Sequence, residues 1–309
     1  MMRSSLLRSI LGTLGPLFLA VVVPAARAAT IIGLCLSAIA CGRAEPERAP
    51  SATGVANAGA PAAANADAPR EDALIVFAAA SLREVFTALG AEFERAHPGV
   101  SVTFNFAGTQ ELRTQIEHGA AADVLASADL RHMDALAQAG RVVGPRVFTK
   151  NRLVLIVARE RKEAIRDIAD VPGAGRVVIG GPEVPIGRYT LQALDRAGAI
   201  LGADFRARVE AKVVSRELNV RQVLAKVRLG EADAGFVYRT DAWPVRAELG
   251  VVELPPEVDV LAEYPIAIAA DAPHASLARS WVELVLGEVG QRALADAGFL
   301  PLEQGGSTR

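Results

Sequence analysis

The feature that most constrains the fold is a regular alternation of strand-like and helix-like patterns that begins at residue 73. Short apolar runs alternate with longer segments whose apolar residues recur at helical spacing. The expected strands are 74–80, 100–106, 123–126, 152–157, 176–180, 209–214, 233–238 and 264–270. The expected helices are 82–97, 109–119, 129–139, 187–197, 218–229, 277–286 and 289–297. This alternation predicts an α/β fold of mostly parallel sheets flanked by helices.

The first of these strands ends in a pattern that suits anion binding. Residues 74–80 are apolar and end in three alanines, and Ser81 follows directly before a helical pattern. Serine is a favoured residue at helix starts, and small alanines let a ligand approach the backbone. Free N–H groups at a helix start, beyond the carboxyl end of a strand, form a ready anion site. An ordinary strand and helix with a capping serine is the alternative interpretation.

Size and charge set broad limits on the class of protein. The chain has 309 residues, of which 22% are charged, and a net charge of −2. This length allows two domains with ample core. The charge balance gives no reason to expect a nucleic-acid partner, and an aromatic content of 5% leaves few residues for base or sugar stacking.

The first 41 residues carry an export signal. Two arginines precede an apolar run and a small-residue pattern ending at Ala28, which is typical of a signal peptide. A second apolar stretch ends at Cys41 and resembles a bacterial lipobox, although Ala38 stands where a larger aliphatic residue is usual. Cleavage after Ala28 and cleavage before Cys41 are both open, and we favour Cys41 as a lipid anchor. Either site places the protein outside the cytoplasmic membrane, in the periplasm.

The remaining terminal segments are expected to lie outside the folded body. Cys35 and Cys41 are the two cysteines of the chain, so we expect no disulfide, no thiol nucleophile and no cysteine metal site in the body. Residues 42–72 are rich in Ala, Pro, Gly and Asn, which predicts a flexible linker. The tail 303–309 is expected to be disordered.

Two stretches of the body echo each other. Segments 115–125 and 226–236 each combine a helix end, a glycine, an Ala-Asp pair and a short apolar strand. A hydroxyl residue and an aspartate follow each segment, the aspartates being Asp129 and Asp241. Two similar lobes with a ligand between them would produce this pattern. The alternative is that two helix-to-strand turns use the same common residues without any duplication.

A set of motifs in a fixed order gives a resemblance to a known family. The motifs are FAAASL at 77–82, FNFAGTQ at 104–110, GAAADV at 119–124, GPEVPIGRY at 181–189, NVRQVL at 219–224, GEADAGFVY at 230–238, EYP at 263–265 and GF at 298–299. In this set the chain resembles the molybdate-binding proteins of ABC transporters, which have the type II periplasmic binding-protein fold. The resemblance runs from about residue 74 to residue 301.

The resemblance implies a domain arrangement and a role. It implies two α/β lobes joined by strands that cross twice, with lobe 1 at 73–150 plus 264–302 and lobe 2 at 151–263. An oxyanion, molybdate or tungstate, would bind in the cleft between the lobes. The protein would be a monomer without a cofactor that delivers the anion to the transporter permease in the cytoplasmic membrane.

The resemblance also implies five ligand-binding residues. Ser81 would offer its hydroxyl and backbone N–H, and Thr109 would offer a hydroxyl where the family commonly has serine. Ile186 and Val220 would each donate a backbone N–H, so their side chains are free to vary. Tyr238 would donate its phenolic O–H from the end of a strand. The metal would enter only as part of the oxyanion.

Donors of this kind suit one class of anion. Neutral N–H and O–H groups can bind a tetrahedral dianion without a buried counter-charge, whose desolvation is costly. The hydrogen of a protonated anion such as hydrogen phosphate would point at a donor hydrogen of the site. Such a site therefore binds phosphate less well than sulfate, molybdate or tungstate. Cavity size decides among the last three. Arg188 and Arg221 lie near the site in sequence, and we expect them to shape its field without acting as ligands.

Three other functions compete with molybdate capture. A binding protein for another oxyanion such as sulfate is the nearest one. A secreted hydrolase could use Ser81 as nucleophile, but no Gly-x-Ser-x-Gly motif surrounds this serine. The histidines show no metal-ligand spacing; they are His97, His118, His132 and His274. The effector half of a transcription regulator shares the fold, but the export signal argues against it. We therefore expect a binding protein and not an enzyme.

Overall fold

The computed structural model describes residues 72–302. The predicted signal peptide, the lipobox with Cys41, the linker and the 303–309 tail lie outside the described residues, apart from residue 72. Within the described range, no helix is both long and apolar enough to cross a membrane.

Strands and helices alternate along the described chain. The strands are β1 (Asp72–Ala79), β2 (Val100–Ala107), β3 (Val124–Ala126), β4 (Val142–Val157), β5 (Val177–Gly180), β6 (Val213–Glu217), β7 (Ala234–Tyr238), β8 (Gly250–Glu253) and β9 (Leu261–Ala269). The α-helices are α1 (Arg83–Ala96), α2 (Thr109–Glu117), α3 (Leu130–Gln138), α4 (Pro185–Leu201), α5 (Phe205–Glu210), α6 (Val220–Arg228), α7 (Arg239–Ala242), α8 (Ala275–Leu286) and α9 (Glu288–Asp296). Short 3₁₀ helices are η1 (Ala80–Leu82), η2 (Arg159–Arg161), η3 (Ile168–Gly173) and η4 (Trp243–Val245).

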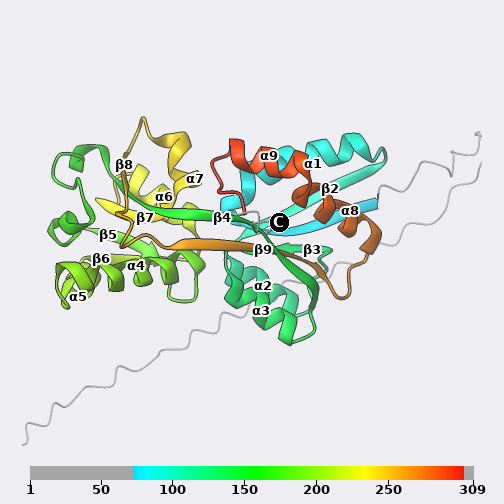
Figure 1. Cartoon of the computed structure of the whole chain (residues 1–309), viewed down its shortest axis with the longest axis horizontal. Coiled ribbons are helices and arrows are strands. Elements are labelled where there is room, and N and C mark those ends of the chain that lie inside the picture. The colour runs from blue at the N-terminus through cyan, green and yellow to red at the C-terminus, as the bar shows by residue number, and fades with distance from the viewer. Residues whose placement is uncertain (1–71, 303–309) are drawn as a thin grey trace, which may run out of the picture. The chain divides into compact units, whose positions relative to one another are not determined.

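The strands pair in the order β2-β1-β3-β9-β4-β7-β5-β6, and β8 adds to β4. We call lobe 1 the group formed by β1–β3 with α1–α3, α8 and α9. We call lobe 2 the group formed by β5–β8 with α4–α7. The two long strands β4 and β9 run between these groups, and helices cover the sheet faces (Figure 1).

The direction of strand pairing follows from this arrangement. Four pairings are parallel, namely β1 with β2 and β3, and β5 with β6 and β7. Each antiparallel pairing of the described strands involves β4 or β9. The sheet is therefore mixed: helical crossovers make the strands within each lobe parallel, and the connecting strands run against them. The predicted lobe boundaries, 150/151 and 263/264, fall inside β4 and β9.

Some element predictions were wrong in detail. The predicted strand 209–214 is mostly helix α5 and its end, because Phe205 and Val209 are buried one helical turn apart. Strand β6 begins only at Val213. Strand β4 begins at Val142, well before the predicted 152, since its first part is largely exposed and lacks an apolar run. The short strand β8 was not predicted.

An aromatic cluster fixes helix α8 against helix α1 and strand β2. Trp281 on α8 is fully buried, and its ring lies 5.5 Å from that of Phe86, 5.6 Å from Phe93 and 5.7 Å from Phe104. Such edge-on aromatic contacts stabilise a core beyond simple area burial. The cluster holds α1 on β2, and with it the turn after β1 that carries Ser81.

Candidate functional site

A small cavity lies where helix starts from both lobes meet. Its lining residues are Ala79, Ala80, Ser81, Ala107, Gly108, Thr109, Ala128, Val184, Pro185, Ile186, Asn219, Val220 and Tyr238. All five residues expected to bind the ligand are therefore brought together. About 20 Å³ of the cavity is open to the centre of a water molecule. This space suits a compact inorganic ion and not an organic solute.

The lobe 1 side offers two buried hydroxyl groups. Ser81 lies in η1 directly after β1, and Thr109 is the first residue of α2 after β2. Thr109 Oγ1 accepts a hydrogen bond of 3.1 Å from the Ala128 N–H, which leaves the threonine hydrogen free for the cavity. Ser81 Oγ lies 2.9 Å from Tyr264 Oη. Each hydroxyl group thus has one protein partner and also faces the cavity.

The lobe 2 side offers backbone N–H groups. The Asn219 side chain accepts from Arg221 N at 3.0 Å and from Gln222 N at 3.2 Å. Asn219 does not cap the Val220 N–H, which is the first of α6, where N–H groups have no intrahelical acceptor. Ile186 follows Pro185 in the first turn of α4, where N–H groups have no intrahelical acceptor. Both groups lie at the positive ends of helix dipoles.

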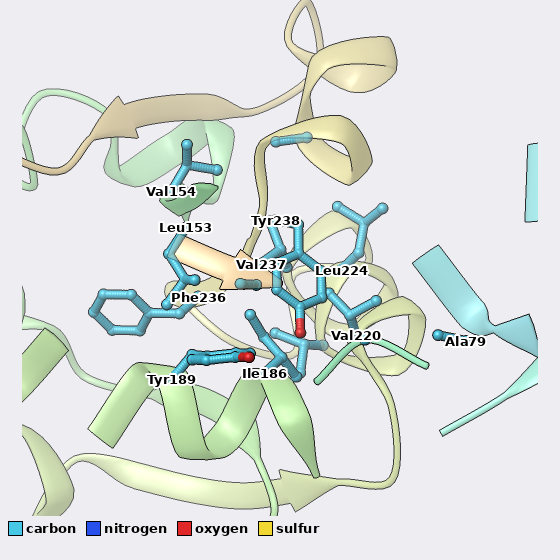
Figure 2. Packing of buried hydrophobic residues seen from close by; sticks show 14 of the residues in the cluster. Ala79, Leu153, Val154, Ile186, Tyr189, Val220, Leu224, Phe236, Val237 and Tyr238 are labelled. Carbon is cyan, nitrogen blue, oxygen red and sulfur yellow. The ribbon is translucent and has the colours of Figure 1, made fainter. Parts of the chain in front are cut away.

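Tyr238 supplies the clearest sign of a missing partner. It ends β7 with 1% of its surface exposed, and its hydroxyl is buried without a hydrogen-bond partner among the described residues. Figure 2 shows this hydroxyl pointing toward Ile186 and Val220. Burial raises the pKa of Tyr238 well above its ordinary value, so the group stays a neutral donor. A buried polar group without a partner costs about 1–3 kcal/mol, which a bound acceptor would offset.

The electrostatics of the cavity favour an anion held by dipoles. Each side chain that the described chain contributes to the lining is uncharged. The helices α2, α4 and α6 all begin at the cavity. Their N-terminal partial charges and the hydroxyl groups together can stabilise negative charge without a lysine or arginine contact. Within residues 72–302, no cluster of three or more His, Cys, Asp or Glu could hold a metal ion.

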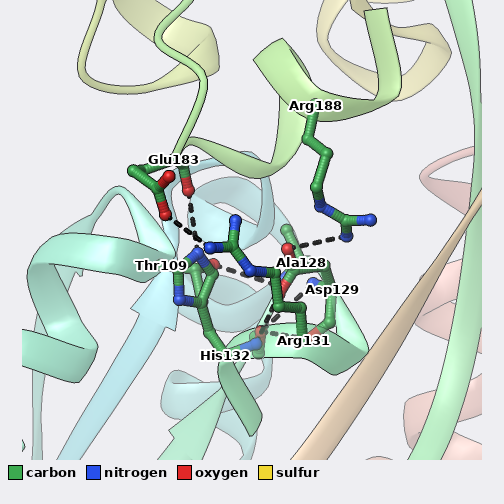
Figure 3. Close-up of polar contacts among 8 residues, drawn as sticks. Thr109, Ala128, Asp129, Arg131, His132, Glu183 and Arg188 are labelled. Atoms are coloured by element: carbon green, nitrogen blue, oxygen red, sulfur yellow. Dashed lines mark hydrogen bonds and ion pairs between the residues drawn. The ribbon is translucent and has the colours of Figure 1, made fainter. Parts of the chain in front are cut away.

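Polar contacts join the two lobes beside the cavity. Arg188 of α4 donates to the Asp129 carboxylate at 2.9 Å, and His132 Nε2 donates to Glu183 O at 2.8 Å (Figure 3). Arg131 also pairs with the Glu183 carboxylate at 2.8 Å, at the exposed edge. In this structure the lobes therefore meet, and the cavity is closed on this side.

A second set of contacts joins the lobes on the other side. Gln110 Nε2 of α2 donates to Leu218 O at 2.7 Å, and Arg221 pairs with Glu84 of α1. Arg221 also lies 2.8 Å from the fully buried Asp241, measured from Nε to Oδ1, but without hydrogen-bond alignment. The Arg221 guanidinium therefore lies between the carboxylates of Glu84 in lobe 1 and Asp241 in lobe 2.

The two arginines near the site do not line the cavity. Each instead forms an ion pair between the lobes, Arg188 with Asp129 and Arg221 with Glu84. Within lobe 2, Arg221 also lies beside the buried carboxylate of Asp241. Asp129 and Asp241 are the two aspartates that follow the echoed segments in the sequence. That echo was the only sequence signal for them, and it did not reveal their partners.

The pKa of Asp241 leads to a testable pH dependence. Burial raises this pKa from 3.8 to about 6, and Arg221 lowers it only in part. Below pH 4 the side chain is protonated in both states, whereas between pH 4 and 6 only the unfolded state has lost the proton. The free energy of unfolding should therefore fall by about 3 kcal/mol as pH rises through this window.

The variant Asp241→Asn should lack this component. The difference in free energy of unfolding, variant minus wild type, should therefore rise by about 3 kcal/mol between pH 4 and pH 7. Urea unfolding at both pH values measures the difference. Asp195→Asn is a matched control, because the Asp195 side chain is 57% exposed. Parallel pH curves for wild type and Asp241→Asn would contradict the interpretation.

Two α/β lobes joined by two strands, with a small cavity between them, define the binding-protein class. The chain belongs to the bacterial extracellular solute-binding protein family, whose model matches residues 74–300. It is 40% identical to the molybdate-binding protein ModA of Mycobacterium tuberculosis over 228 residues, 73% of this chain and 84% of that protein. ModA of Escherichia coli is 32% identical over 216 residues, 67% of this chain and 81% of that protein.

Solved structures agree with the fold. The substrate-binding domain of a putative molybdenum ABC transporter from Clostridium difficile matches with a TM-score of 0.57 and 27% identity, covering 75% of this chain and all of that one. The periplasmic molybdate-binding protein of Azotobacter vinelandii matches with a TM-score of 0.66 at 20% identity, covering 74% of this chain and 100% of that one. The sulfate-binding protein SubI of M. tuberculosis matches with a TM-score of 0.68 at 20% identity, covering 76% and 88%. The predicted family resemblance and α/β fold are confirmed.

Proposed function

We propose that this protein captures molybdate, with tungstate as a second ligand, outside the cytoplasmic membrane and delivers it to an ABC transporter permease. The buried hydroxyl of Tyr238, which has no protein partner in the described range, carries the proposal. It faces a small cavity to which Ser81 and Thr109 add hydroxyls. The names of the relatives, molybdate-binding proteins at up to 40% identity, support molybdate as the anion.

The ligand-binding role of the five residues is part of this proposal. Ser81, Thr109 and Tyr238 would donate O–H groups, and Ile186 and Val220 would donate backbone N–H groups. These donors come from both lobes, so a bound anion would draw the lobes together. The lobe boundaries at 150/151 and 263/264 belong to the same proposal, and their position inside the connecting strands β4 and β9 supports them.

Two features outside the described residues complete the proposal. Lipidation of Cys41 would hold the protein at the membrane surface near the permease, with residues 42–72 as a tether. Palmitate labelling of the expressed protein tests this anchor, and labelling that persists in Cys41→Ser would contradict it. We infer that the protein acts as a monomer and needs no cofactor.

Sulfate is the second candidate ligand, because the same neutral donors fit any small tetrahedral dianion. The fold similarity to a sulfate-binding protein is compatible with this alternative. A hydrolase using Ser81 finds less support, since Ser81 Oγ pairs with the phenol of Tyr264 and not with a histidine or carboxylate. A general base next to the nucleophile is what such an enzyme requires.

Thermal unfolding of the expressed protein with molybdate, tungstate, sulfate and phosphate tests the function. A ligand at 1,000 times its dissociation constant stabilises the folded state by about 4 kcal/mol. For a folded body of this size, the expected rise in Tm is on the order of 8–16 °C. We expect this rise with molybdate and none with phosphate. No rise with any oxyanion would contradict binding, and a rise with sulfate alone would favour the second candidate.

Removal of the Tyr238 hydroxyl tests the site. Tyr238→Phe keeps the ring but removes one donor to a buried charge, so we expect the molybdate affinity to fall by about tenfold or more. Titration calorimetry measures the affinity. Tyr189→Phe is a matched control, because Tyr189 is also a buried tyrosine of lobe 2 but does not line the cavity. An unchanged affinity in Tyr238→Phe would mean that the anion binds elsewhere.

A further inference from the structure

A buried tyrosine stands directly behind one of the proposed donors. Tyr264 on β9 is fully buried and does not line the cavity, yet its Oη lies 2.9 Å from Ser81 Oγ. The two residues are 183 positions apart in the sequence. Tyr264 therefore contacts the site through Ser81 and from one of the strands that connect the lobes.

The ring of Tyr264 is held in place by other aromatic rings. Its centroid lies 5.6 Å from that of Phe299, 5.7 Å from Tyr238 and 6.4 Å from Phe148, all nearly edge-on. Close packing of this kind leaves the hydroxyl one position, next to Ser81. Burial also raises the pKa of Tyr264 well above its ordinary value, and the hydrogen bonds with Ser81 and Asn151 oppose this only in part. The phenol keeps its proton at neutral pH.

The neighbours of Asn151 fix that side chain beside Tyr264. Asn151 Nδ2 donates to Thr240 Oγ1 at 2.8 Å, and Asn151 Oδ1 accepts from Arg152 N at 3.0 Å. An amide nitrogen has two hydrogens, so one remains after the bond to Thr240. The Asn151 side chain also opposes the rise in the pKa of Tyr264.

The direction of the Ser81–Tyr264 hydrogen bond decides what Ser81 presents to the cavity. Each hydroxyl carries one hydrogen. If Ser81 donated to Tyr264, only its lone pairs would face the cavity, and these repel an anion. If Tyr264 donates to Ser81, the serine hydrogen is left for the cavity. Binding of an anion at Ser81 therefore requires Tyr264 to be the donor.

We propose that Tyr264 is a positioning residue that holds Ser81 as a hydrogen donor toward the anion and thereby selects fully deprotonated tetrahedral oxyanions. The inference rests on the proposed oxyanion-binding function. Without the phenol, the serine hydroxyl can rotate and accept a hydrogen bond. A protonated anion such as hydrogen phosphate could then donate to it, so discrimination against phosphate would weaken.

A double-mutant cycle tests the role of Tyr264. Titration calorimetry of the full chain with molybdate would compare the wild type, Tyr264→Phe, Ser81→Ala and the double variant. We expect Tyr264→Phe to lower the affinity about five- to tenfold, and to have almost no further effect when Ser81 is already alanine. Losses that multiply in the double variant would overturn the inference, because Tyr264 would then act independently of Ser81.

Competition with inorganic phosphate at pH 7 measures the ratio of molybdate to phosphate affinity. A simple loss of packing around Tyr264 would not change this ratio. We expect the ratio of molybdate to phosphate affinity to fall by about fivefold or more in Tyr264→Phe, and to stay unchanged in the Tyr189→Phe control. A ratio unchanged in Tyr264→Phe would overturn the selectivity part. A wild type that binds no oxyanion would instead overturn the proposed function, and with it the inference, whereas wild-type binding with independent losses would overturn only the role of Tyr264.

Discussion

Replacing Gly187 by alanine is expected to remove high-affinity anion binding and to destabilise lobe 2 by about 3 kcal/mol or more. A Cβ atom at this position would lie 2.0 Å from Gly181 O and 2.4 Å from Gly180 O. Both neighbours are backbone atoms at the end of β5, so no side chain can turn away to make room. The first turn of α4 must shift instead.

This shift would act on the cavity directly. Ile186 precedes Gly187 and lines the cavity from the same turn. A donor displaced by an ångström or more no longer meets its acceptor at hydrogen-bond distance. Urea unfolding and molybdate calorimetry measure the two effects separately.

Gly198→Ala is the matched control for this prediction. Gly198 lies in the same helix, and a Cβ there would meet nothing within 4 Å. Alanine inside a helix is more stable than glycine by roughly 0.5–1 kcal/mol, so this variant should be slightly stabilised and bind normally. A Gly187→Ala protein as stable and as tightly binding as Gly198→Ala would refute the close packing of α4 on β5.

The second large effect is expected at the ion pair between Arg188 and Asp129. The Asp129 side chain is fully buried in this structure, whereas that of Arg188 is 27% exposed. Arg188→Met would leave a buried carboxylate without its counter-charge whenever the lobes meet. Breaking such a pair costs about 3–5 kcal/mol, and we take the lower end because Arg188 is partly exposed. If binding requires closed lobes, molybdate affinity should fall by about 100-fold.

An exposed ion pair between the same lobes provides the control. Arg131 and Glu183 pair at 2.8 Å, but their side chains are 46% and 63% exposed. Exposed pairs contribute about 0–1 kcal/mol, so Arg131→Met should change affinity less than about fivefold. Equal effects of the two variants would show that burial of Asp129 does not govern closure.

The fold was largely predictable because buried strands and amphipathic helices leave strong local patterns. The apolar run before Ser81 predicted β1 and the turn after it correctly. The first part of β4 was missed because it is mostly exposed and is held by pairing with β9. That pairing joins residues more than a hundred positions apart, which no local pattern reveals.

The candidate site was predictable only in part. Ser81 and Thr109 stand where a strand turns into a helix, a position that local chemistry makes visible. Ile186 and Val220 contribute backbone groups, so their side chains carry no signal and only the family resemblance selected them. Tyr264 and Asp129 were missed because their roles depend on partners across the fold.

The central claim is that these donors converge on one tetrahedral oxyanion, and crystals grown with molybdate test it most directly. Anomalous difference density measured at the molybdenum absorption edge locates the metal without any assumption about the fold. We expect one strong peak in the cavity, with its oxygens within hydrogen-bond distance of Ser81, Thr109, Tyr238 and the backbone N–H groups of Ile186 and Val220. A cavity without such a peak, or a peak outside it, would contradict the claim.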